Sequence, residues 1–327
     1  MSGVHGWLIL DKPLGLGSTQ GVSAVKRALR DAGFDVSKRG IKVGHGGTLD
    51  PLATGVLPIA LGEATKLAGR MLDSDKVYDF TIGFGVQTDT LDLEGKVIAE
   101  SAVRPTFAQV EAVLARFTGP IEQVPPVYSA LKVDGARAYD LARAGAEVVL
   151  AGRAVTIHRL SVRHPGLVPG STAQQAATSQ AEEWTPEQVR GDEVGSITLT
   201  AHVSKGTYIR ALARDIAIAL GTVGHVTYLR RTKAGPFDLA QAISLDKLAE
   251  LGKARTLEDK LLPLRAGLDD IPALPLSPDQ AGLLRQGRVL IGIAADDGPY
   301  FALSDDVPIA LVEVLDREVR VVRGFNL

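Results

Sequence analysis

The chain contains no cysteine among its 327 residues. Without thiols it forms no disulfide, carries no thiolate nucleophile and holds no zinc ion or iron–sulfur cluster through sulfur ligands. Its six histidines are scattered along the sequence and form no closely spaced pair. Because metal-binding histidines usually recur at short spacings, we predict no metal site.

A long hydrophobic run is also absent. No stretch approaches the roughly 20 apolar residues that a membrane-spanning helix needs, and the N-terminus lacks the basic and apolar regions of a signal peptide. We therefore expect a soluble, cytoplasmic protein that contacts no membrane. The net charge of −2 shows no excess of either sign, so a nucleic-acid surface has to be a local basic patch.

Apolar residues make up 45% of the chain, enough for one large domain and a smaller one. Strand and helix patterns alternate without a regular strand–helix–strand repeat, which predicts an α+β fold with a mixed sheet. Residues 165–193 are dominated by small and polar residues, and we interpret them as a flexible insertion without catalytic residues. Pro272 and Pro275 mark a linker, so we predict domains at 1–268 and 272–327, the second small and β-rich.

Several local signals predict individual elements. Ser18 or Thr19 can cap the helix that follows the first apolar run. Thr106 and Gln109 have the spacing of a capping box. Pro58 stands inside an apolar run that has the pattern of a strand. Because proline has no backbone N–H to donate to a neighbouring strand, it favours an edge strand or a bulge.

The segment from Val43 to Gly55 combines three glycines with His45, Asp50 and Pro51. Glycine tolerates positive φ and lets another backbone or a ligand approach closely. Pro51 biases Asp50 toward an extended conformation. Two interpretations remain open from these residues alone: a turn in which Asp50 caps the next element, or a restrained corner that positions a catalytic carboxylate.

The strongest basic concentration lies between Ser204 and Gly235. Six Lys and Arg residues stand there against one acidic residue, Asp215, and Tyr208 and Tyr228 are interleaved with them. This pattern is typical of a surface that contacts phosphates and stacks on bases, and the alternative is a solvated basic helix face.

Seven segments, in order from the first strand to about residue 265, resemble the TruB family of tRNA pseudouridine synthases. They are Leu10–Pro13, Gly44–Gly55, Gly62–Lys66, Asp75–Tyr78, Pro126–Lys132, Ser204–Arg210 and His225–Arg231. The tail resembles, more loosely, a small PUA-type RNA-binding module. Gly46 and Thr48 depart from the family pattern, in which Thr and Ala are more usual at these positions.

The resemblance implies isomerisation of the T-loop uridine of tRNA, at position 55, to pseudouridine without cofactor or metal. It implies a mainly antiparallel sheet, with residues 124–152 forming a thumb-like insertion that grips the RNA. Asp50 matches the catalytic aspartate, Tyr78 the tyrosine that stacks on the base, and Arg210 the arginine paired with that aspartate.

The remaining matched residues are implied to bind the substrate. His45 fills the space that the flipped uridine leaves, and Leu229 makes an apolar contact to the base. Phosphate or framework contacts are expected from Lys12, Lys66 and the pair Arg230 and Arg231, and base or phosphate contact from Tyr208. The partner is the T-arm stem-loop of tRNA, bound by a monomer without an obligatory protein partner.

Three other functions compete with this one. The chain could be a guide-RNA-dependent pseudouridylase subunit, or a tRNA-folding chaperone without catalysis. The glycines between Gly15 and Gly21 also suggest a nucleotide-dependent oxidoreductase, but their spacing departs from the dinucleotide fingerprint.

Overall fold

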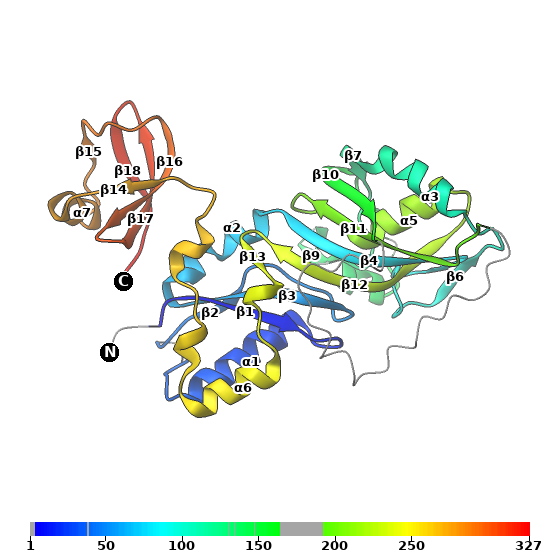
Figure 1. Cartoon of the computed structure of the whole chain (residues 1–327), viewed down its shortest axis with the longest axis horizontal. Helices are drawn as coiled ribbons and strands as arrows, with labels where there is room; N and C mark the ends of the chain where they lie inside the picture. The colour runs from blue at the N-terminus through cyan, green and yellow to red at the C-terminus, as the bar shows by residue number, and fades with distance from the viewer. Residues whose placement is uncertain (1–3, 38, 130, 134, 147, 164–191) are drawn as a thin grey trace. The chain divides into compact units, whose positions relative to one another are not determined.

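The computed structural model describes residues 4–37, 39–129, 131–133, 135–146, 148–163 and 192–327 (Figure 1). The predicted flexible insertion at 165–193 lies outside these residues except for its last two. The chain divides into two units, Met1–Ser74 with Thr232–Leu327 and Asp75–Arg231, and each is considered by itself. No helix among the described residues is both long and apolar enough to cross a membrane.

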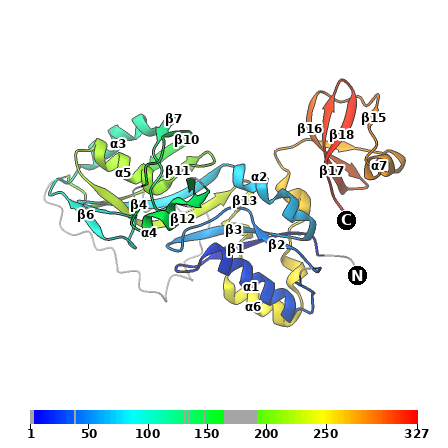
Figure 2. The same cartoon turned by 180° about the vertical axis from the view of Figure 1, so that it is seen from behind.

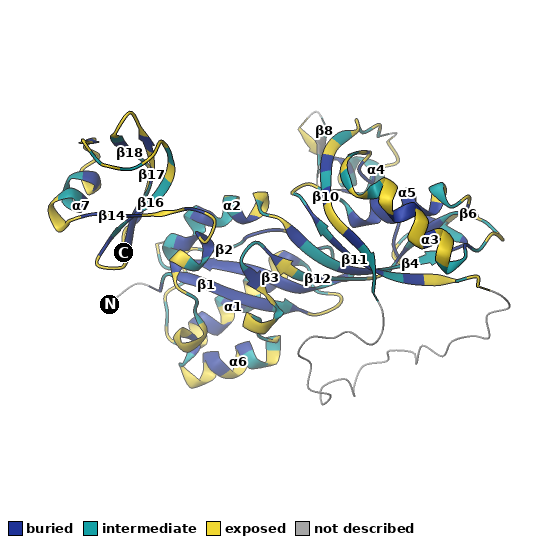
Figure 3. Cartoon of the chain, turned by 45° about the horizontal axis from the view of Figure 1, so that its top comes forward, coloured by how far each residue is buried: buried dark blue, intermediate teal, exposed yellow. Residues whose placement is uncertain are grey.

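The first unit is built on short antiparallel strands with helices packed against them. Its strands are β1 (Gly6–Lys12), β2 (Val43–His45), β3 (Ala53–Leu61) and β13 (Phe237–Asp238). Its helices are α1 (Ser18–Asp31), η1 (Gly62–Leu67), α2 (Ala68–Asp73), η3 (Leu239–Gln241), α6 (Leu245–Ala254), η4 (Leu257–Lys260) and η5 (Leu264–Gly267). β3 pairs with both β1 and β2, and β1 and β3 are buried along most of their length (Figure 3). Helices α1 and α6 lie side by side (Figures 1 and 2).

The second unit is a larger antiparallel sheet. Its elements are β4 (Lys76–Phe84), β5 (Val86–Thr88), β6 (Val97–Glu100), α3 (Phe107–Leu114), η2 (Ala115–Phe117), β7 (Gly119–Gln123), β8 (Lys132–Val133), β9 (Ala136–Arg137), α4 (Ala138–Arg143), β10 (Arg153–Val162), β11 (Ser196–Val203) and α5 (Ile209–Ala219). Strand β12 (Gly224–Ala234) begins here and ends in the first unit. The sheet order is β12-β4-β11-β10-β7, and α5 packs its apolar side on the buried residues of β4 and β11 (Figure 1). The expected α+β fold with a mainly antiparallel sheet is confirmed.

A separate five-stranded sheet ends the chain. It comprises β14 (Ala273–Pro275), α7 (Pro278–Arg285), β15 (Leu290–Ile291), β16 (Gly298–Ser304), β17 (Val307–Leu315) and β18 (Glu318–Gly324). Ser277 caps α7, because its hydroxyl accepts a hydrogen bond from the N–H of Gln280. The predicted small β-rich region is therefore present, but it begins inside the predicted linker, because Pro275 is the last residue of β14 and pairs with Leu303 of β16. The domain boundaries themselves stay a prediction.

The C-terminal residues tie this sheet to the rest of the first unit. Glu63 accepts hydrogen bonds from the Lys66 ammonium at 2.6 Å and from the backbone N–H of Asn326 at 2.8 Å. Lys66 also donates to the carbonyl of Gly324 at 2.9 Å. Burial alone would raise the pKa of Glu63, but these two donors and the nearby charges outweigh it and hold the pKa below its ordinary value of 4.5.

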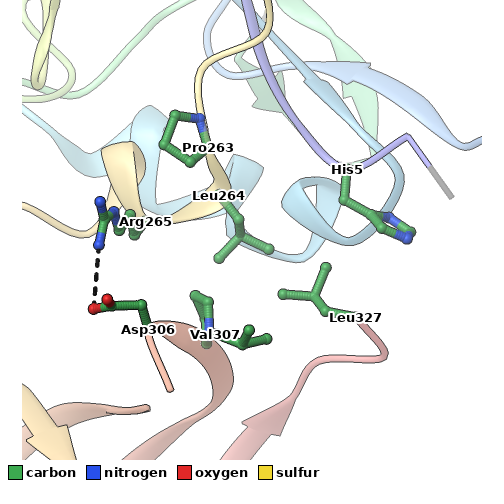
Figure 4. Close-up of a pocket in the computed structure, with 8 residues that line it drawn as sticks. His5, Pro263, Leu264, Arg265, Asp306, Val307 and Leu327 are labelled. Atoms are coloured by element: carbon green, nitrogen blue, oxygen red, sulfur yellow. Dashed lines mark ion pairs between the residues drawn. The ribbon is translucent and has the colours of Figure 1, made fainter. Parts of the chain in front are cut away.

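A cavity of about 360 Å³ lies beside this tie (Figure 4). Its walls are mostly apolar side chains, and Arg265 and Asp306 form an ion pair at its rim with an N–O separation of 3.7 Å. The lining residues are His5, Pro263, Leu264, Arg265, Asp306, Val307, Pro308 and Leu327. None of the predicted site residues lines this cavity.

Two local expectations are wrong. The N-cap of α1 is Gly17, because the Ser18 hydroxyl is engaged elsewhere, with the backbone of Leu49. Pro58 lies at neither an edge nor a bulge: β3 runs between β1 and β2, and Pro58 pairs with Ile9 in unbroken register. Directly after β2, the N–H of Gly46 donates a hydrogen bond to the carbonyl of Pro58. On this side of β3 the proline serves only as an acceptor, so its missing N–H is not required.

Candidate functional site

The loop between β2 and β3 carries Asp50, and the residue before it is fixed by a side chain of α1. Ser18 accepts a hydrogen bond from the N–H of Leu49 at 2.8 Å and donates its own hydroxyl to the carbonyl of Leu49 at 3.0 Å. Ser18 and Leu49 are both buried. The Ser18 hydroxyl thus holds both the N–H and the carbonyl of Leu49. The backbone directly before Asp50 therefore has little conformational freedom.

The residue after Asp50 is fixed by the turn that follows β1. The carbonyl of Pro51 accepts hydrogen bonds from the N–H of Gly15 at 2.9 Å and from the Lys12 ammonium at 3.2 Å. Lys12 is fully buried, and its ammonium also donates to the carbonyls of Leu16 at 2.6 Å and Pro13. A buried ammonium surrounded by carbonyl oxygens favours a framework role for Lys12 over direct contact with a phosphate.

Close packing holds the glycine-rich start of the same loop. His45 ends β2 opposite Ile59, and Gly47 adopts a φ of +133° that few other residues tolerate. A Cβ on Gly46 would lie 2.7 Å from the Cβ of Met71. The departure from the family pattern at Gly46 therefore coincides with a position where this chain has no room for a side chain.

In the second unit, Tyr78 lies on β4 opposite Ala201 of β11. Tyr78 and Leu229 are partly buried and pack against the same apolar core. The structure thus places the predicted stacking tyrosine and the predicted apolar contact beside one core, on neighbouring strands.

Arg210 is buried at the start of α5 and makes contacts that the sequence did not indicate. Its guanidinium donates to the carbonyls of Thr90 at 2.8 Å and Tyr128 at 3.0 Å, and lies 3.3 Å from a carboxylate oxygen of Asp92. Asp92 is itself buried and held by the Thr90 hydroxyl and the N–H of Glu94. Arg210 therefore joins two of the segments that carry the family resemblance, while its pairing with Asp50 stays a prediction.

Tyr208 is fixed by Gln123, a residue that sequence analysis did not select. The Gln123 side-chain oxygen accepts from the N–H of Tyr208 at 2.8 Å, and its amide donates to the carbonyl of Tyr208 at 3.2 Å. The guanidinium of Arg153 stacks over the Tyr208 ring, 4.7 Å from its centroid. Arg230, on β12, is half-buried. Lys66 donates to the carboxylate of Glu63 and to the carbonyl of Gly324, near the C-terminus.

The predicted site residues thus fall into two groups. Lys12, His45 and Asp50 belong to the first unit, and the loop carrying Asp50 is held on both sides. Tyr78, Arg210 and Leu229 belong to the second. The assembly of the two groups into one site stays a prediction from the resemblance.

Two protein-family models match consecutive parts of the chain. The model of the TruB family pseudouridylate synthase N-terminal domain matches residues 35–209. The model of the tRNA pseudouridylate synthase B C-terminal domain matches residues 210–269, ending before the five-stranded sheet.

Curated relatives match over nearly the full length. The protein described as tRNA pseudouridine synthase B of Novosphingobium aromaticivorans is 60% identical over 324 residues, covering 99% of this chain and 98% of that protein. Its counterpart in Zymomonas mobilis is 56% identical and covers 99% and 96%. A solved structure titled "Structure of H/ACA RNP bound to a substrate RNA containing 2'-deoxyuridine" superimposes with a TM-score of 0.68 over 98% of this chain and 85% of that one. At 21% identity that likeness concerns the fold alone.

Proposed function

Because the chain belongs to the TruB family of pseudouridylate synthases, it isomerises a uridine of tRNA to pseudouridine, and we propose that this uridine is the one at position 55 in the T loop. The family models and the full-length relatives support the reaction. The choice of the T-arm rests on the resemblance of the seven segments. We further propose that the enzyme acts in the cytoplasm as a monomer, without cofactor, metal or guide RNA in the reaction.

The reaction exchanges one bond to the ribose for another. The bond from N1 of uracil to C1′ breaks, the base turns, a bond from C5 to C1′ forms, C5 loses its proton and N1 gains one. Asp50 is the proposed nucleophile, because a carboxylate can bond to an electron-poor carbon and leave again. Arg210 is proposed to keep Asp50 ionised, and Tyr78 to stack on the base and assist removal of the proton.

Access to the uridine requires its removal from the stacked T loop, at an energetic cost of a few kcal/mol. His45 is proposed to fill the vacated space, and Leu229 to contact the extruded base. Lys66, Tyr208 and Arg230 are proposed to contact the RNA backbone or its bases. The PUA-like assignment of the last sheet, as a further RNA-binding module, belongs to the same proposal.

The observation that carries the proposal is the double restraint on the Asp50 loop. Ser18 holds the backbone before Asp50, and Lys12 with Gly15 holds it after. A loop whose aspartate only capped a neighbouring element would not need its flanking peptides held by a buried ammonium and a buried hydroxyl. Such restraint suits a group that must stay within a fraction of an ångström of a reacting atom.

The direct test is incubation of the purified protein with a synthetic T-arm stem-loop, without any other RNA or protein. We expect pseudouridine at position 55, and a stem-loop with cytidine at this position should stay unmodified. Modification that appears only after a guide RNA or partner protein is added would favour the guide-dependent subunit. Refolding of tRNA without any modification would favour the chaperone.

A further inference from the structure

Asp75, His158 and His202 come together in the second unit, although they are far apart in the sequence. The Nε2 atoms of His158 and His202 lie 3.1 and 3.5 Å from the same Oδ2 atom of Asp75, and the two imidazole centroids are 4.8 Å apart. We propose that these three side chains form a binding site for a divalent transition metal of the zinc type.

The backbone brings the three residues to one place. Asp75 directly precedes β4, and the pairing of β4 with β11 puts His202 opposite Val77, two residues further on. On the other side of β11 the register shifts between Ile157 and Arg159, so His158 is the extra residue of a β-bulge. Bulges redirect a side chain, and this one brings the ring of His158 beside that of His202.

The separations suit a tetrahedral ion. Zinc bonds imidazole nitrogen and carboxylate oxygen at about 2.0–2.2 Å, so two ligand atoms at the tetrahedral angle lie roughly 3.3–3.5 Å apart. The two Asp75–His separations, 3.1 and 3.5 Å, lie close to this value. All three ligand atoms fall within 4.8 Å of one another, so a small rotation of the rings is enough to close the set around one ion.

The chemistry of the donors selects the class of metal. Two imidazoles with one carboxylate suit zinc and its neighbours, whereas magnesium and calcium prefer oxygen ligands alone. A metal ion can accept lone pairs from both imidazole rings and from the carboxylate at the same time. Two protonated imidazoles with centroids 4.8 Å apart would instead repel each other. The side chains are 37–48% exposed, which gives the ion a route from solvent and leaves a fourth position for water.

A bound ion would join β10, β11 and the residue that leads into β4. Binding to the folded state alone raises the free energy of unfolding in proportion to the logarithm of metal concentration over Kd. The proposed metal would stabilise the fold of the second unit.

The test is titration of the full-length protein, stripped of metal by a chelator, with ZnCl₂ in a calorimeter and with CoCl₂ by visible absorption. We expect one ion per chain, the intense visible bands of a tetrahedral Co²⁺ site, a rise in Tm with Zn²⁺, and no response to MgCl₂. His158→Gln and His202→Gln should each weaken Zn²⁺ binding by at least about tenfold, since even second-shell partners of metal ligands are worth about 10–100-fold.

The matched control is Arg159→Gln. Arg159 is exposed, follows His158 directly and lies opposite His202, but offers no ligand atom. It should bind Zn²⁺ at least as tightly as the parent, because the change removes a positive charge. Circular dichroism verifies that each variant is folded. Equal Zn²⁺ affinity in the parent and the His158→Gln/His202→Gln double variant would overturn the proposal and leave the cluster as an ion pair.

Discussion

Ser18→Ala tests whether the hydroxyl on α1 holds the backbone beside Asp50. The hydroxyl makes two hydrogen bonds to Leu49, at 2.8 and 3.0 Å, and Leu49 is 4% exposed. Removing it leaves a buried N–H and a buried carbonyl without this partner. Depriving a buried polar group of its partner costs about 1–3 kcal/mol, so the free energy of unfolding should fall by roughly that amount.

That loss is large enough to measure. In a domain of 150–250 residues, 1 kcal/mol shifts Tm by about 2–4 °C, so Tm should fall by about 2–12 °C. Ser23→Ala is the matched control on the same helix: its hydroxyl donates to the carbonyl of Thr19 on an exposed face, where the loss should stay within about 0.5 kcal/mol.

The same variant should lose activity. If the peptide before Asp50 moves, the carboxylate is displaced from the reacting atom, and kcat should fall about 10- to 100-fold while affinity for the stem-loop changes little. Release of tritium from uridine labelled at C5 measures the rate, since C5 loses its proton in each turnover. If Ser18→Ala matched Ser23→Ala in both Tm and kcat, the restraint argued for this loop would be refuted.

Gly46→Ala should lower the free energy of unfolding by about 1–3 kcal/mol, because its Cβ would lie 2.7 Å from that of Met71, whereas Gly44→Ala meets nothing within 4 Å; equal urea midpoints would contradict this. Glu63→Gln should destabilise the protein most at neutral pH. The folded pKa of Glu63 lies below 4.5, so its contribution is complete above that value and disappears as the pH falls through the folded pKa; an unfolding difference that persists in acid would be inconsistent. Arg210→Lys should lower kcat far more than affinity for the stem-loop, and a loss confined to Kd would make the arginine a phosphate contact.

Local signals with a mechanism confined to a few residues predicted the structure well. Thr106 and Gln109 form the expected capping box, with both reciprocal hydrogen bonds. The two partners are close in sequence, so the pattern contains the whole interaction.

The errors occur where a distant partner decides. Ser18 or Thr19 was expected to cap the first helix, but Leu49, 31 residues from Ser18, engages the Ser18 hydroxyl. Pro58 was expected at an edge or a bulge, but Gly46, directly after β2, donates to its carbonyl on the side of the strand where a proline has no N–H. Neither outcome can be predicted from the spacing of nearby residues.

In the candidate site, too, contacts between residues distant in sequence were not predicted. The resemblance predicted roles for Asp50 and Arg210, which stay predictions, but it did not reveal that Asp92 lies against the guanidinium of Arg210. Nor did the scattered histidines indicate that a bulge brings His158 beside His202. Contacts between strands depend on register and bulges, which a single sequence does not display.

Asp50 is proposed to perform the chemistry and not to be needed for binding. The most direct measurement compares the parent with Asp50→Asn on the T-arm stem-loop, following pseudouridine at position 55 and the Kd for the RNA together. Asparagine has nearly the same size and cannot act as a carboxylate nucleophile, so we predict no turnover and a Kd within a few-fold of the parent. Turnover by Asp50→Asn at a rate near that of the parent would show that Asp50 is not the nucleophile.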